Sequence, residues 1–209
     1  MPVSLAYCCV VLIWSTTPLA MKWSTEGVGF LFAVTSRMSI GMIVAVLICS
    51  ISGTGLPLSR KALLTYLVSG TGVYLTMLFS YWALQFIPSG WVSVIFGLSP
   101  VITSILGTCI LRERTVSVTK TGSLAICLTG LFVMFHHGMS ADAAIAHGIL
   151  AVIAGTLCYS TSLVAIKSIN ADIRPVSTMT GTLVITVILL LVTWQVSGPT
   201  PPHQVRARL

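Results

Sequence analysis

The chain of 209 residues is 56% apolar, and only 7% of its residues are charged. Soluble domains carry roughly 25% charged residues, so this composition excludes a water-soluble globular protein. The formal net charge of +7 does not indicate a nucleic-acid partner, because the basic residues lie in short polar stretches between long apolar runs. The composition predicts an all-α integral membrane protein whose main partner is the lipid bilayer.

Seven apolar runs follow one another along the chain, each close to the roughly 20 residues that a helix needs to cross a bilayer. Helices are expected because lipid offers no hydrogen-bond partner to an open backbone. We therefore predict about seven transmembrane helices, at Val3–Met21, Val28–Ile51, Ala62–Phe86, Gly90–Leu111, Val116–Phe135, Gly148–Ile166 and Val176–Val196.

The basic residues between these runs are distributed unequally. With the N-terminus in the cytoplasm, the cytoplasmic loops hold seven basic residues and the outer segments hold three. The seven are Arg60, Lys61, Arg112, Arg114, Lys120, Lys167 and Arg174; the three are Lys22, Arg206 and Arg208. Since cytoplasmic loops carry the excess of Lys and Arg, we expect a cytoplasmic N-terminus.

One short phrase occurs twice. Trp14–Lys22 reads WSTTPLAMK, and Tyr159–Lys167 reads YSTSLVAIK, 145 positions later. Five predicted spans separate the two copies, and an odd number of crossings inverts the second copy relative to the first. Inverted repeats are typical of secondary transporters, whose substrate site lies at the interface of the halves. The alternative is a chance match of small residues between two apolar segments.

Further motifs lie around the third and fourth spans. They are YWALQFIPSG at Tyr81–Gly90, LSP at Leu98–Pro100 and LRER at Leu111–Arg114, together with Trp14-Ser15, Arg37, Gly122 and Gly130. From residue 3 to about 196 the chain resembles the EamA-type permeases of the drug/metabolite transporter superfamily. The resemblance implies ten helices, as two inverted five-helix repeats, and transport of metabolites or drugs across the plasma membrane, here a bacterial inner membrane.

The second repeat departs from that pattern because it has two helices rather than five. We divide the chain into a first repeat at residues 1–137, a partial second repeat at 138–196 and a disordered tail at 197–209, which is rich in proline and glycine. We expect the chain to be incomplete as given, through a fragment, a frameshift or a degraded gene. A genuine short form that pairs with another chain, for instance as a homodimer, is the alternative.

Prolines and hydroxyl side chains within the spans are the candidates for a substrate cavity. Pro18 leaves the carbonyl of Trp14 without its helical amide partner, and Pro100 does the same for Phe96. Such carbonyls can bind a polar solute, although serine and threonine also serve ordinary helix packing. The cavity candidates are Trp14, Ser15, Thr17, Pro18, Arg37, Tyr74, Ser99, Pro100, Tyr159 and Ser160.

Arg37 is the only charged residue deep within a predicted span. A charge there is expensive, and no carboxylate lies deep within any span to pair with it. Gly41, four residues later on the same side, predicts close approach of another helix. We expect Arg37 to face the cavity, with snorkelling toward the membrane surface as the alternative.

The aromatic residues Tyr81, Trp82 and Trp91 flank the connection between the third and fourth spans, and we expect them in the interfacial belt. Glu113, which stands between two arginines, is expected to order the cytoplasmic end of the fourth helix rather than to bind substrate.

These patterns predict a secondary transporter that moves a small-molecule substrate by alternating access. A seven-helix sensor or receptor and an intramembrane enzyme with Ser99 as nucleophile are the alternatives. A proline follows Ser99 directly, which is unfavourable for a nucleophile turn. No cofactor, catalytic residue or metal site is predicted.

Overall fold

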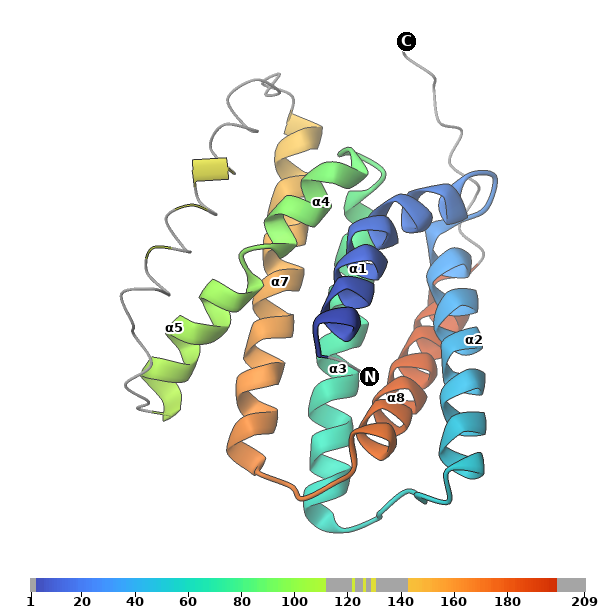
Figure 1. Cartoon of the computed structure of the whole chain (residues 1–209). Coiled ribbons are helices and arrows are strands. Elements are labelled where there is room, and N and C mark those ends of the chain that lie inside the picture. Colours follow the sequence, from blue (N-terminus) through green and yellow to red (C-terminus); the bar gives the residue numbers. More distant parts are fainter. Residues whose placement is uncertain (1–2, 112–121, 123–125, 127–128, 131–142, 199–209) are drawn as a thin grey trace.

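The computed structural model describes residues 3–111, 122, 126, 129–130 and 143–198, and every regular element in this part of the chain is a helix (Figure 1). The helices are α1 (Val3–Thr25), α2 (Phe30–Ile51), α3 (Arg60–Ala83), α4 (Ser89–Phe96), α5 (Ser99–Leu111), α7 (Ala143–Ile169) and α8 (Pro175–Ser197). The all-α fold class is confirmed for these residues.

Five stretches of helix among the described residues have the length and apolar composition to cross a membrane. They are α2, α3, α4 together with α5, α7 and α8. Helix α1 occupies the first predicted span, while most of the predicted span at 116–135 lies outside the described residues. A multi-pass membrane protein is therefore confirmed, and the total of seven spans stays a prediction.

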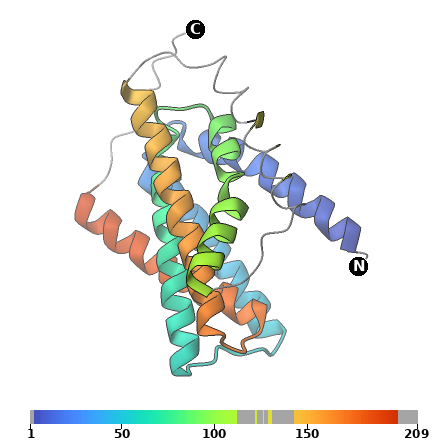
Figure 2. The same cartoon turned by 90° about the vertical axis from the view of Figure 1, so that its left-hand side faces the viewer.

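Helix α3 lies at the centre of the arrangement. It packs against α7, α8 and α2, while α4 and α5 lie against α7 (Figures 1 and 2). The contact of α3 with α8 is close: a Cβ atom on Gly70 would lie 2.5 Å from the Cβ atom of Ile185. Small residues at such positions allow two helices to approach, which is how membrane helices gain packing contacts.

Helix α1 lies at the edge. It packs against α4 and α2 near its C-terminal end, and Figure 2 shows its N-terminal end projecting from the side of the bundle. Many of its apolar side chains are exposed, including Leu12 and Ile13. In a bilayer such a surface is covered by lipid.

Hydroxyl side chains of α8 connect it to α2 and α3. Thr180 donates to the carbonyl of Ala45 in α2, over 3.2 Å, and Thr186 donates to the carbonyl of Gly70 in α3, over 3.0 Å. Thr182 and Ser69 share a hydrogen bond of 2.6 Å between their hydroxyl oxygens. These bonds satisfy polar groups that lipid could not.

Two loops meet at one end of the bundle, the end at the bottom of Figure 1. They are the α2–α3 and α7–α8 connections, and Ser177 at the start of α8 donates to the carbonyl of Gly55 over 2.8 Å. The exposed basic residues Arg60, Lys61, Lys167 and Arg174 lie in or next to these two connections. The structure thus gathers at one end four of the residues expected in the cytoplasm.

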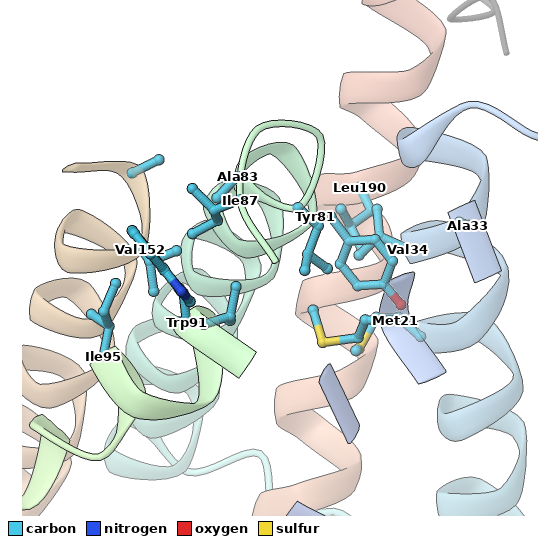
Figure 3. Close-up of a cluster of buried hydrophobic side chains, with 14 of the residues drawn as sticks. Met21, Ala33, Val34, Tyr81, Ala83, Ile87, Trp91, Ile95, Val152 and Leu190 are labelled. Carbon is cyan, nitrogen blue, oxygen red and sulfur yellow. The ribbon is translucent and has the colours of Figure 1, made fainter. Parts of the chain in front are cut away.

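The core joins side chains from α1, α2, α3, α4, α7 and α8 in one buried cluster (Figure 3). Tyr81 is fully buried in it and Trp91 is 8% exposed. The expectation that these two residues lie in an interfacial belt is wrong, because neighbouring helices cover their rings. Trp82 is partly exposed and packs edge-on against Phe86, with ring centroids 4.8 Å apart.

Candidate functional site

The helix of the fourth span is interrupted. Helix α4 ends at Phe96 and α5 begins at Ser99, with Gly97 and Leu98 forming a turn between them. The amide of Gly97 donates to the carbonyl of Ser93 over 3.1 Å, and that of Leu98 reaches back three residues to Ile95, over 3.0 Å. Pro100 has no amide hydrogen, so the carbonyl of Phe96 lacks its usual partner in the next turn. The interruption coincides with the kink that Pro100 predicts.

The second copy of the repeated phrase contacts this interruption. Ser160 of α7 is fully buried, and its hydroxyl donates to the carbonyl of Ser99 over 3.2 Å. Ser99 itself is 8% exposed, whereas Pro100 is exposed. The contact joins Ser160 to Ser99, 61 positions earlier and next to Pro100, and Tyr159, partly buried, adjoins Ser160.

Tyr74 has a different role in the packing. Its hydroxyl shares a hydrogen bond of 2.7 Å with the hydroxyl of Thr193, which links α3 to α8. The side chain is half-buried. The contact is one of several polar links between these helices.

The first copy of the phrase lies on the exposed helix α1. Trp14 is 55% exposed, and the Ser15 hydroxyl donates to the carbonyl of Leu12 in its own helix, over 3.0 Å. Thr17 likewise donates to the carbonyl of Ile13, over 2.6 Å, and Pro18 is buried. Helix α1 runs through Pro18 without interruption, so the two prolines act differently.

Arg37 is half-buried on α2. Among the described residues the structure gives it no hydrogen bond or ion pair. No described atom lies within 4 Å of the position that a Cβ on Gly41 would take. The close approach that Gly41 predicts is therefore absent from this part of the chain. The expectation that Arg37 faces the cavity is supported only by its depth within the span.

Glu113 lies outside the described residues, as do Arg112, Arg114 and Lys120. Within the described ranges no group of His, Cys, Asp and Glu side chains could hold a metal ion.

Sequence reasoning missed one polar contact and two unpaired hydroxyls. Thr76 of α3 donates to the carbonyl of Gly155 in α7 over 3.0 Å, and the hydroxyls of Thr35 and Tyr81 are buried without a partner in the described part of the chain. The pattern STMTGT at Ser177–Thr182 could have indicated the polar face of α8. No feature of the sequence indicates that Tyr81 is buried unpaired.

A comparison with curated proteins found no match. The sequence model of the EamA-like transporter family matches residues 1–136, which is more than half of the chain. The match includes the interrupted helix and the first copy of the phrase. The chain therefore belongs to the EamA-like transporter family.

Proposed function

We propose that the protein is a secondary transporter that moves small metabolites or drugs across the plasma membrane by alternating access. The observation that carries this proposal is the contact of Ser160 with the carbonyl of Ser99 at the interrupted helix. Discontinuous helices at the interface of inverted repeats form substrate sites in secondary transporters, because helix ends present unpaired backbone groups.

The site would use the two copies of the phrase in different ways. Ser99, Pro100, Tyr159 and Ser160 would form one wall, with the carbonyl of Phe96 available to a solute. Ser15, Thr17 and Pro18 of α1 would form a second wall, and Arg37 would supply positive charge. Further helices, from a second copy or from a longer chain, would complete the enclosure.

The same proposal assigns an orientation. The end that carries Arg60, Lys61, Lys167 and Arg174 would face the cytoplasm, because cytoplasmic loops are enriched in Lys and Arg. The N-terminus would then lie on the cytoplasmic side as well.

Membrane vesicles from the native host, with the gene intact or deleted, test the transport proposal in the protein's own assembly. We expect deletion to remove saturable flux of at least one compound from a panel of amino acids, other metabolites and cationic drugs. Identical flux for every compound in both vesicle preparations would refute the proposal.

A further inference from the structure

Tyr81 carries a hydroxyl group that the fold does not use. The residue is fully buried, and its phenolic oxygen has no hydrogen-bond partner within the described ranges. Tyr74 lies seven residues earlier, two turns along the same side of α3, and its hydroxyl is paired with Thr193. Of the three tyrosines of α3, Tyr74 is therefore paired, whereas Tyr81, like Tyr66, has a buried hydroxyl without a partner among the described residues.

The surroundings of Tyr81 are apolar. Met21 of α1, Val34 of α2 and Leu190 of α8 belong to the same buried cluster, and Figure 3 shows the hydroxyl end of the ring pointing toward Met21. A buried tyrosine hydroxyl usually finds a partner, since leaving one unpaired in an apolar site is unfavourable. Phenylalanine would fill the same space without that penalty, so packing does not account for the hydroxyl.

The cover over the hydroxyl comes from the helix at the edge of the bundle. Met21 is buried, but much of the preceding length of α1 is exposed, including Leu12 and Trp14. The main contacts of α1 are with α4 and α2, whereas Tyr81 lies on the central helix α3. A small displacement of α1 would uncover Tyr81 without disturbing the contacts of α3 with α7 and α8.

We propose that the Tyr81 hydroxyl is a solute-binding group, which Met21 covers in this conformation. When α1 moves away, the hydroxyl donates a hydrogen bond to an oxygen or nitrogen acceptor on the transported molecule. The phenolic O–H group supplies the one donor that such an acceptor needs. The inference rests on the proposed function and adds to it a residue on α3 and a requirement for an acceptor atom in the substrate.

Replacing each tyrosine by phenylalanine separates binding from folding. In the purified protein, Tyr81→Phe is expected to keep or raise the midpoint of thermal unfolding, while Tyr74→Phe lowers it because the hydrogen bond between α3 and α8 at Thr193 is lost. In native-host vesicles Tyr81→Phe is expected to raise the half-saturation concentration about tenfold. A half-saturation concentration within twofold of the wild type would overturn the proposal, and would leave a buried water as the partner of the hydroxyl.

The movable cover is tested without any substrate. In a variant whose native cysteines are replaced by alanine, Tyr81→Cys is expected to react with a water-soluble maleimide about tenfold faster than Ile95→Cys, since only its cover opens. Ile95 is equally buried, at 1% exposure, on α4. Equal reaction rates would overturn the proposal. Its failure differs from failure of the proposed function, which would show as absent flux in the vesicles of the wild type.

Discussion

Helices α1 and α7 carry the two similar copies of the repeated phrase, and the serines of these copies have opposite surroundings. Ser160 of α7 is buried and bonds to another helix, whereas Ser15 of α1 is exposed and bonds to its own. The reason lies in the neighbours, since α7 packs against α3, α4 and α5 while α1 lies at the edge. A hydroxyl in a membrane helix thus becomes an interhelical link only where a second backbone is close.

The largest effect is expected at Gly155, where α7 lies in close contact with α3. A Cβ atom on Gly155 would lie 3.3 Å from the Cβ atom of Phe79, so Gly155→Leu forces the helices apart. We expect it to lower the free energy of unfolding by about 3 kcal/mol, measured by denaturant titration in detergent. Gly41→Leu is the matched control, because that position on α2 opens onto free space. Equal losses for both variants would show that α7 is not closely packed.

The two serines of the phrase test the comparison directly. Ser160→Leu places a larger side chain in a closed space and removes the bond to Ser99, so we expect a loss of about 2 kcal/mol in unfolding free energy. Ser15→Leu adds an apolar group to an exposed surface and should leave stability unchanged or raised. If Ser15→Leu is as harmful as Ser160→Leu, then α1 is buried in the working assembly.

Arg37 lies on α2, which packs against α1. If α1 and α2 border the path of the solute, Arg37→Leu should reduce flux in native-host vesicles about tenfold while expression holds. Arg37→Lys should recover only part of the flux, because lysine keeps the charge but lacks the planar guanidinium group. Normal flux from the leucine variant would place Arg37 outside the path.

The smallest effect concerns single hydroxyl bonds. Thr76→Val removes the bond to the carbonyl of Gly155 and is expected to lower the unfolding free energy by roughly 1 kcal/mol. Thr17→Val removes a bond within α1 alone and is expected to change it by less. Thermal unfolding of the two variants side by side measures the difference, and a reversed order would contradict the view that α7 depends on its polar links.

The sequence predicted the extent of most helices well and their partners poorly. The predicted span Val28–Ile51 agrees with α2 at Phe30–Ile51, because the ends of a membrane helix follow from the length of its apolar run. The interruption at Pro100 was also foreseeable from proline chemistry.

Burial was the part that the sequence could not supply. Lipid is as apolar as a protein interior, so hydropathy does not distinguish a lipid-facing side from a protein-facing one. Ser15 and Ser160 occupy equivalent positions in the two copies of the phrase, yet only Ser160 is buried. Tyr81 flanks a short connection, as interfacial aromatics do, yet it is fully buried. These assignments depend on tertiary contacts that no local pattern encodes.

The bonds from α8 to α2 and α3 have a consequence for biosynthesis. The ribosome delivers α2 and α3 to the membrane well before α8, yet Thr180 and Thr186 of α8 connect to both of them. Helices α2 and α3 are therefore inserted before the helix that connects them is available. Until α8 arrives, this intermediate is the form of the protein that membrane proteases and insertion chaperones encounter.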